Sequence, residues 1–215
     1  MPSTLILVPT PFELTILRPV LESNIDLSSV TLECCGFGAI ASAARAAQLM
    51  SGGRPDRVIL TGIAGSINDR LRIGQAYWFA NVAAFGIGAG SGEQFLTAGE
   101  MNWPHWDAQG EEDHIGDVID LVTGNNPREP NAGTLLTACA ASAHQPDVDL
   151  RLAKFPAAVA EDMEGFSTAL AGRLCGIPVE IVRGISNSAG DRNKENWKIR
   201  EALTAAAELI IESLS

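Results

Sequence analysis

The sequence is short of basic residues, with 15 Lys and Arg against 26 Asp and Glu, for a net charge of −11. Binding to a nucleic-acid backbone needs clustered Lys and Arg that displace counterions. The composition therefore argues against a nucleic-acid partner. At 46% hydrophobic and 19% charged residues, the chain is expected to be globular rather than disordered.

Long apolar runs are also lacking, since none approaches the roughly 18 residues of a membrane-spanning helix. The first apolar run, Leu5–Val8, has no basic flank and is too short for the core of a signal peptide. It predicts a buried strand, and no membrane partner is expected.

Cysteine and histidine are few, and their spacing matches no metal site or disulfide framework. The four cysteines form no C-x-x-C pair, which favours a reduced, cytoplasmic setting; they are Cys34, Cys35, Cys139 and Cys175. The three histidines show no metal-ligand spacing; they are His105, His114 and His144. We therefore expect no metal and no cofactor.

Short apolar runs alternate with Ala-rich amphipathic runs, which predicts an α/β layered fold with a mostly parallel sheet. The expected strands are Thr4–Val8, Val30–Cys34, Arg57–Thr61, Gln75–Val82, Gly133–Thr137, Ala157–Ala160 and Val179–Gly184. The expected helices are Phe12–Leu21, Ala39–Met50, Ile115–Val122, Met163–Cys175 and Trp197–Leu214. Ligands in such folds bind at the carboxyl ends of strands, so the residues after each strand are the candidates for a site.

The stretch Ala83–Pro130 departs from this alternation, with several glycines, the Trp103–Trp106 segment and the acidic run Glu111–Asp113. A long irregular segment in a compact domain is usually functional. A lid or a subunit contact and a plain surface excursion both remain open.

Two motifs after strands have a known chemical use and an ordinary structural one. Gly36-Phe37-Gly38-Ala39-Ile40-Ala41 matches a dinucleotide-binding pattern, but Asp56 precedes the strand that it should close, which argues against a nicotinamide cofactor. The motif instead favours packing of the backbone close to another ligand. Glu13 follows the first strand, where a carboxylate either complements a helix dipole or acts as a general base.

Three further segments follow strands. The glycines of Thr61-Gly62-Ile63-Ala64-Gly65 allow the backbone to approach a ligand closely, or they form a tight turn from strand to helix. The carboxylates of Glu161-Asp162-Met163-Glu164 repel one another, so a solvated helix N-terminus explains them most simply. The segment Gly184–Arg192 is a candidate ligand-contact loop or a capping loop before the last helix.

Taken in order, these motifs resemble the purine nucleoside phosphorylase and nucleosidase superfamily. The resemblance covers most of the chain and weakens between Ala83 and Pro130. Its tail, Gly184-Ile185-Ser186-Asn187 with Gly190-Asp191-Arg192 and Trp197, is most similar to the futalosine hydrolases of the alternative menaquinone route. The resemblance implies a single domain over residues 1–215, a three-layer α/β/α sandwich with a mixed, mostly parallel sheet.

The resemblance also implies catalytic and substrate-binding residues for cleavage of an N-glycosidic bond. Glu13 matches the carboxylate that polarises the attacking water, and Glu164 the one near the 2′-hydroxyl that stabilises a cationic ribose. An anionic Glu13 repels phosphate, which favours hydrolysis over phosphorolysis. The substrate-binding residues implied are Met163, Gly62, Ala64, Gly65, Asp162, Ser186 and Asp191.

Asn187 is the implied reader of the base. The related 6-aminopurine nucleosidases have Asp at this position, which can pass a proton to N7, whereas an amide cannot. An amide suits a 6-oxopurine such as the hypoxanthine of futalosine. Asp191 and solvent are the candidates for the proton that the leaving base needs.

The predicted function is hydrolysis of a 6-oxopurine nucleoside, futalosine first, by a homodimer or higher homo-oligomer. The alternatives are a methylthioadenosine/S-adenosylhomocysteine-type nucleosidase, a purine nucleoside phosphorylase, and a nucleoside-binding protein without catalysis. The family often places an aromatic residue in the loop that here contains Ala138-Cys139-Ala140, so an aromatic partner for the base must come from elsewhere.

Overall fold

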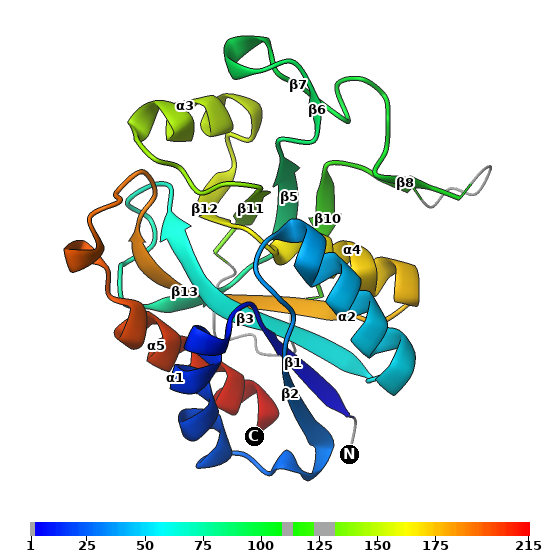
Figure 1. The fold of residues 1–215 in the computed structure, drawn as a ribbon, viewed down its shortest axis with the longest axis vertical. Coiled ribbons are helices and arrows are strands. Elements are labelled where there is room, and N and C mark those ends of the chain that lie inside the picture. The colour runs from blue at the N-terminus through cyan, green and yellow to red at the C-terminus, as the bar shows by residue number, and fades with distance from the viewer. Residues whose placement is uncertain (1–2, 109–113, 123–131) are drawn as a thin grey trace.

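The computed structural model describes residues 3–108, 114–122 and 132–215 (Figure 1). In these residues nine strands form one sheet: β1 Thr4–Val8, β2 Val30–Cys34, β3 Arg57–Ser66, β4 Ala76–Trp78, β5 Asn81–Phe85, β10 Val118–Asp120, β11 Thr134–Ala138, β12 Ala158–Asp162 and β13 Val179–Ser188. The helices are α1 Pro11–Glu22, α2 Ala39–Gly53, α3 Gln145–Lys154, α4 Gly165–Cys175 and α5 Ile199–Leu214.

The sheet is mixed and mostly parallel, as the sequence predicts. Its order is β10-β5-β11-β12-β3-β1-β2, with β13 paired to β3 and to β4. The parallel pairs are β1 with β2 and β3, β13 with β3, and β11 with β5 and β12. The antiparallel pairs are β10 with β5, β13 with β4, and a two-residue contact of β12 with β3.

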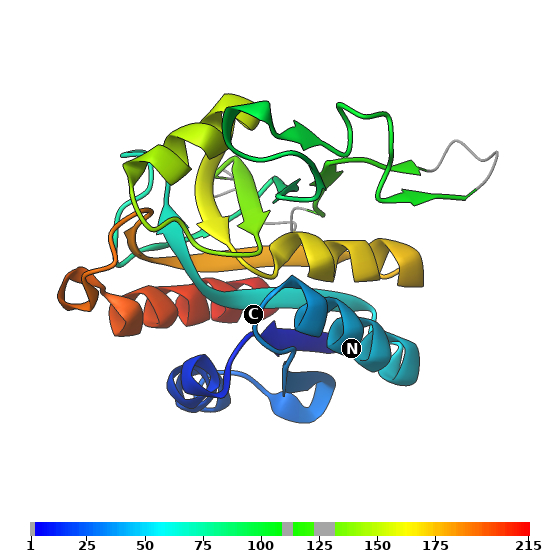
Figure 2. The ribbon, with the colours of Figure 1, turned by 45° about the horizontal axis from the view of Figure 1, so that its top comes forward.

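Helices cover both faces of the central strands, because those strands are apolar on both faces. Leu5 and Leu7 of β1 belong to the core that also contains Met50 of α2. The intervening Ile6 and Val8 belong to a second core, with residues of α1 and α5. In both ribbon views α2 lies beside α4, and α1 beside α5 (Figures 1 and 2). This is the expected three-layer α/β/α arrangement.

Two elements differ from the sequence prediction. The expected helix Ile115–Val122 is wrong, because this stretch holds the end of β9 (His114–Ile115) and then β10. Ile119 and Leu121 are buried and Asp120 is exposed, a period of two that the helical spacing of Ile115 and Ile119 concealed. The expected strand Gln75–Val82 is divided into β4 and β5, and helix α3 was not predicted.

Strands β3 and β13 are longer than expected, and this changes the setting of two motifs. The predicted turn Thr61–Gly65 lies within β3, and Ser186 and Asn187 lie within β13. The two strands pair in parallel over nearly their whole length, with a bulge at Ser186. Mutual pairing satisfies the backbone groups that a turn would leave unpaired, so both motifs extend as strand.

The atypical segment after β5 forms two small antiparallel ribbons in its described part. They are β6 Gly88–Ala89 with β7 Leu96–Thr97, and β8 Trp106–Asp107 with β9. Figure 1 shows these strands away from α1 and α5. The acidic run Glu111–Asp113 and the end of the segment at Pro130 lie outside the described residues. Across the described ranges, no helix combines the length and the apolar character that crossing a membrane requires.

Gly184 provides a stability test of the contact between β13 and α5. A Cβ at this position would overlap the carbonyl of Ala202 on α5. We expect Gly184→Ala to reduce the free energy of unfolding by about 1–3 kcal/mol or more, because backbone cannot yield as a side chain can. Urea unfolding measures the change.

Gly52→Ala is the matched control, because a Cβ there meets nothing within 4 Å and the residue lies in α2. We expect this variant to be neutral or slightly stabilising. Equal stability of the Gly184→Ala variant and the parent would contradict the packing described here.

Candidate active site

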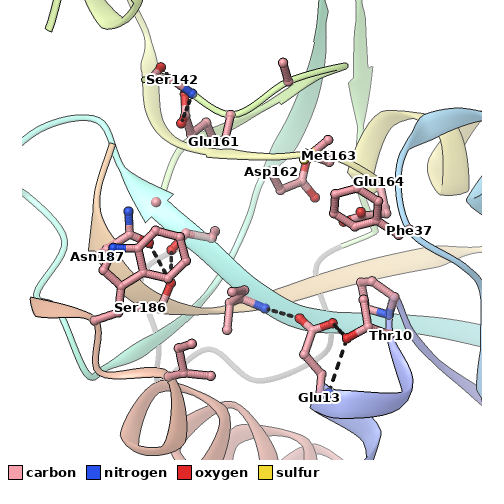
Figure 3. A pocket seen from close by; sticks show the side chains of 18 of the residues that line it. Thr10, Glu13, Phe37, Ser142, Glu161, Asp162, Met163, Glu164, Ser186 and Asn187 are labelled. Carbon is pink, nitrogen blue, oxygen red and sulfur yellow. Dashed lines mark hydrogen bonds between the residues drawn. The ribbon is translucent and has the colours of Figure 1, made fainter. Parts of the chain in front are cut away.

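A cavity of about 900 Å³ opens at the carboxyl ends of the central strands. This volume is at the upper end of the roughly 300–1,000 Å³ typical of small-molecule sites. Figure 3 shows side chains converging on it from several elements. The lining residues are Pro9, Thr10, Phe12, Glu13, Phe37, Ile63–Gly65, Cys139–Ala143, Glu161–Glu164, Ser186, Asn187, Arg192, Lys194, Trp197 and Ile199.

Glu13 is held rigidly at the start of α1, although the cavity is open above it. Thr10 is the N-cap of α1, and its hydroxyl donates to Glu13 Oε2 at 2.5 Å. The backbone N–H of Ile63 in β3 donates to Glu13 Oε1 at 2.9 Å. The side chain is buried, so the two donors fix a carboxylate that faces the cavity (Figure 3). Both uses predicted for Glu13, helix-start carboxylate and site carboxylate, are compatible with this position.

The acidic cluster is not a solvated helix N-terminus, contrary to the simplest explanation of the sequence. Glu161, Asp162 and Glu164 are all buried. Buried arginines, instead of water, compensate their negative charge. Glu161 pairs with Arg151 of α3, whereas Asp162 and Glu164 pair with Arg183 of β13. Helix α4 begins only at Gly165.

Arg183 is a fully buried cation that joins three strands beneath the cavity. Its guanidinium donates to Asp162 Oδ2, to Glu164 Oε2 at 3.2 Å and to the carbonyl of Thr61 at 3.2 Å. Burial lowers the pKa of Arg183, but the carboxylates of Asp162, Glu164 and Glu13 outweigh it and the net shift is upward. The guanidinium is therefore a permanent positive charge under the acidic floor of the site.

Asp162 lies at the cavity wall and forms its hydrogen bonds with buried groups of the protein interior. Its Oδ1 accepts from Thr137 Oγ1 at 2.6 Å, and its Oδ2 accepts from the Gly165 N–H at 2.8 Å and from Arg183. Its side chain is wholly inaccessible. Met163 is half-buried at the cavity wall, between Asp162 and Glu164.

The carboxyl group of Glu164 is perturbed by its burial and its charged neighbours. The Gly38 N–H of the loop before α2 donates to its Oε1 at 2.9 Å, so the Gly36-Phe37-Gly38 turn positions a carboxylate. Burial raises the pKa of Glu164 to about 7, opposed by Arg183 and reinforced by Asp162. Protonated and ionised forms are therefore both accessible near neutral pH.

Gly62 does not line the cavity, but the site depends on its lack of a side chain. Its φ is +146°, and a Cβ there would lie 2.5 Å from Arg183 Nη1 and 2.8 Å from Glu13 Oε1. The close approach that the sequence indicated is therefore an approach of these two side chains. The following residues, Ala64 and Gly65, do line the cavity.

Asn187 and Ser186 form the side of the cavity opposite Glu13 and Glu164 (Figure 3). Ser186 Oγ donates to Asn187 Oδ1 at 2.7 Å, and Asn187 Nδ2 donates to the carbonyl of Ser188 at 2.7 Å. These bonds fix the amide with one N–H still available. The side chain can therefore donate to an acceptor on a ligand.

A buried ion pair fixes the loop that follows β11. Arg151 binds Glu161 Oε2 and also donates to the Ala140 carbonyl at 2.5 Å. Glu161 Oε1 accepts from the Ser142 N–H at 2.8 Å. Residues 139–143 of this loop, which contain no aromatic side chain, are thus held as one wall of the cavity. The aromatic rings that line the cavity in the described part of the chain are Phe12, Phe37 and Trp197.

Asp191 is not brought to the cavity wall. Its carboxylate accepts from the Asn193 N–H and from Asn196 Nδ2, both at 2.8 Å, and so organises the loop before α5. Within residues 86–122, nothing that the structure describes borders the cavity either. Of that segment's histidines, His105 lies 3.1 Å from Asp117 and packs on Phe166.

Sequence reasoning missed Arg183 and Arg151, and of these Arg183 carried a signal. An arginine inside the apolar strand Val179–Gly184 is not tolerated without a buried carboxylate, and the nearby acidic cluster was the available partner. Thr10 was also missed, although Thr three residues before Glu is the pattern of a capping box. Among the described residues, no group of three His, Cys, Asp or Glu is arranged to hold a metal ion.

Comparison with known proteins gives consistent matches. The family model described as the phosphorylase superfamily matches residues 19–215. A futalosine hydrolase of Streptomyces coelicolor is 29% identical over 74% of this chain, and the aligned part spans 65% of that relative's length. A 5′-methylthioadenosine/S-adenosylhomocysteine nucleosidase of Actinobacillus succinogenes is 28% identical over 88% of this chain, and the aligned part spans 80% of that relative's length.

Among solved structures, the Colwellia psychrerythraea 5′-methylthioadenosine/S-adenosylhomocysteine nucleosidase in complex with adenine has the same fold. Its TM-score is 0.79 at 18% identity, covering 99% of this chain and 94% of that one.

The raised pKa of Glu164 predicts a pH dependence of stability. Folding raises the pKa of Glu164 from the usual 4.5 to about 7, so the folded state binds this proton more tightly than the unfolded state does. The bound proton therefore stabilises the folded state at low pH. That contribution is lost as the pH rises toward about 7. We expect Glu164→Gln to remove it, so that its unfolding free energy falls less steeply from about pH 5 to pH 7 than the parent's.

Urea unfolding at several pH values measures both slopes, and Glu22→Gln, an exposed carboxylate on α1, is the control. Parallel curves for the parent and the Glu164→Gln variant would contradict the prediction. An overall loss of stability in the variant would not, because the test compares slopes.

Proposed function

The chain belongs to the phosphorylase superfamily, and we propose that it is a nucleosidase that hydrolyses the N-glycosidic bond of a purine nucleoside. The observation that carries the proposal is the pair of buried carboxylates, Glu13 and Glu164, that face one cavity and are fixed by donors from different elements. Two carboxylates around one bond suit a reaction that passes through a cationic sugar.

In this mechanism, Glu164 stabilises the transition state. The base departs with the electron pair of the glycosidic bond and takes a proton from solvent, since Asp191 does not line the cavity. Positive charge develops on the ribose ring, and an ionised Glu164 beside the 2′-hydroxyl interacts with it more strongly than with the neutral substrate. The Gly38 N–H and Arg183 hold the carboxylate in position. Met163 provides the adjacent apolar wall.

Glu13 activates the water. Its two oxygens are oriented by Thr10 and Ile63, which leaves the carboxylate fixed in the cavity to accept a proton from a water held against the ribose. The nucleophile position therefore carries a negative charge, and that charge disfavours phosphate. This supports hydrolysis over phosphorolysis.

Asn187 selects the base. Its free N–H matches an acceptor such as the 6-oxo group of hypoxanthine, since the amide oxygen already accepts from Ser186. The preferred substrate is accordingly a 6-oxopurine nucleoside, and futalosine is the first candidate because a futalosine hydrolase is among the relatives. A methylthioadenosine/S-adenosylhomocysteine-type nucleosidase is the second candidate, favoured by the broader match to such enzymes.

Glu13→Gln tests the role of the base. We expect turnover to fall by about 10²- to 10⁴-fold while substrate binding is retained, because an amide still accepts from Ile63 but cannot take a proton. Rates are measured by release of the free purine, and binding by calorimetry. Glu22→Gln, on the same helix but exposed, is the matched control. A near-normal rate for Glu13→Gln would remove this residue from the mechanism.

Asn187→Asp tests base selection. We expect the ratio of kcat/KM for hypoxanthine over adenine nucleosides to fall by about tenfold to a hundredfold, since a carboxylate beside a 6-oxo group leaves an acceptor without a donor. Competition between the paired nucleosides in one reaction gives the ratio directly. An unchanged ratio would show that another group reads the base.

A further inference from the structure

The cavity wall formed by residues 139–143 presents backbone groups to a ligand. Cys139, Ala140 and Ala141 are exposed, line the cavity and carry small side chains, so their peptide groups are accessible. Among the described residues, none forms a hydrogen bond with the N–H or the C=O of Ala141. This residue therefore has one donor and one acceptor available to a ligand.

Three buried side chains, which we call the Arg151–Glu161–Ser142 cluster, hold the peptide groups on either side of Ala141. Arg151 Nη2 donates to the Ala140 carbonyl at 2.5 Å, and Glu161 Oε1 accepts from the Ser142 N–H at 2.8 Å. Glu161 Oε2 accepts from Ser142 Oγ at 2.7 Å and from Arg151. Because these groups bind one another and the loop, the role that remains for the cluster is to position backbone.

The geometry of the peptide bond determines where the free groups of Ala141 point. A trans peptide holds its C=O and its N–H in opposite directions. The Ala140 carbonyl faces Arg151, which does not line the cavity, so the Ala141 N–H points away from that buried side. The Ser142 N–H faces Glu161, so the Ala141 carbonyl points away from the cluster as well.

The sheet places this wall on the same side of the cavity as the amide that reads the base. Glu161 of β12 and Asn187 of β13 both pair with Gly65 of β3. Gly65 lines the cavity and has no side chain, so bare backbone separates the two. Figure 3 shows Ser142, Glu161 and Asn187 together, away from the two carboxylates of the mechanism. The wall and the amide thus flank the space that the purine would occupy.

We propose that the Arg151–Glu161–Ser142 cluster is a positioning device for base recognition. It directs the N–H and the C=O of Ala141 to the edge of the purine that carries N1 and the 6-substituent. A 6-oxopurine has an N1–H donor beside its O6 acceptor, and one backbone C=O and N–H complement this pair. O6 has a second lone pair, which stays available to the Asn187 amide.

This inference rests on the proposed nucleosidase function and adds to it a specificity determinant behind the cavity wall. The arginine fork is the part that can be tested, because Arg151 reaches both the Glu161 carboxylate and the Ala140 carbonyl. A lysine at this position keeps the positive charge beside Glu161, but its single ammonium cannot reproduce the planar fork. Arg151→Lys therefore loosens the loop without leaving a buried carboxylate unpaired.

The test uses two forms of one nucleoside, one with hypoxanthine and one with unsubstituted purine, which lacks both O6 and the N1–H. We expect Arg151→Lys to reduce the preference in kcat/KM for the hypoxanthine form by roughly threefold to tenfold, mainly through a higher KM for that form. The two bases differ as leaving groups, but this difference cancels when the variant is compared with the parent. A structural role alone lowers both rates by one factor, and an unchanged preference would overturn the proposal.

Arg57→Lys is the matched control. Arg57 also forks between a buried carboxylate and a carbonyl, with Glu180 at 3.2 Å and Ser213 O at 3.4 Å. It lies at the start of β3, the end remote from the cavity, and does not line the cavity. We expect this variant to keep the preference of the parent. An equal reduction in both arginine variants would contradict a specific role for Arg151.

Two further measurements keep the proposal separate from folding and from the proposed function. If Arg151→Lys does not fold, the double variant Arg151→Gln, Glu161→Gln replaces it, because it leaves no buried charge unpaired. The same loss of preference is expected, and the parent's preference in this variant would overturn the proposal.

If no nucleoside is cleaved, the proposed function fails, and calorimetry of free hypoxanthine and free purine still tests the cluster. Tighter binding of hypoxanthine by the parent, reduced in the Arg151 variant and retained in Arg57→Lys, supports the positioning role. An equal ratio of affinities in the parent and the Arg151 variant contradicts it, and so does the absence of binding of either base to the parent.

Discussion

The buried guanidinium of Arg183 is the interaction on which the site depends. A cation removed from water is stable only if fixed negative partners surround it, and here Asp162 and Glu164 supply them from the end of β12 and the turn beyond it. The same contact that neutralises Arg183 also fixes Glu164 at the cavity. Because Gly62 has no side chain, the guanidinium can lie close to Glu13 as well, so one buried positive charge acts on both carboxylates.

The fold makes this arrangement possible by bringing the strand ends together. β1 is covered on both faces, so it lies in the middle of the layers, and its carboxyl end leads directly to Thr10 and Glu13. β3 and β13 extend past it in parallel and carry Ile63 and Asn187 to the same edge. Strand ends and a helix start therefore carry the carboxylates and the amide of the cavity, whereas Arg192 and Lys194 line it from the loop between β13 and α5.

Much of this could be predicted from sequence, because the signals were local. The apolar runs predicted β1, β2 and the starts of β3 and β13, and the residues after them predicted where the cavity lies. The environment of the acidic cluster could not be predicted in the same way. Whether Glu161 faces water or Arg151 depends on α3, whose weak apolar pattern gave no helix prediction. The lengths of β3 and β13 likewise depend on their mutual pairing, which no single segment encodes.

The most direct test of the central claim is chromatographic detection of free base released from purine nucleosides with and without phosphate. Futalosine, inosine, adenosine and methylthioadenosine form the panel. The account predicts release without phosphate, with hypoxanthine from futalosine as the fastest product. Release that strictly requires phosphate would contradict the role of Glu13, and no release from any member would contradict the assignment of the cavity as a nucleosidase site.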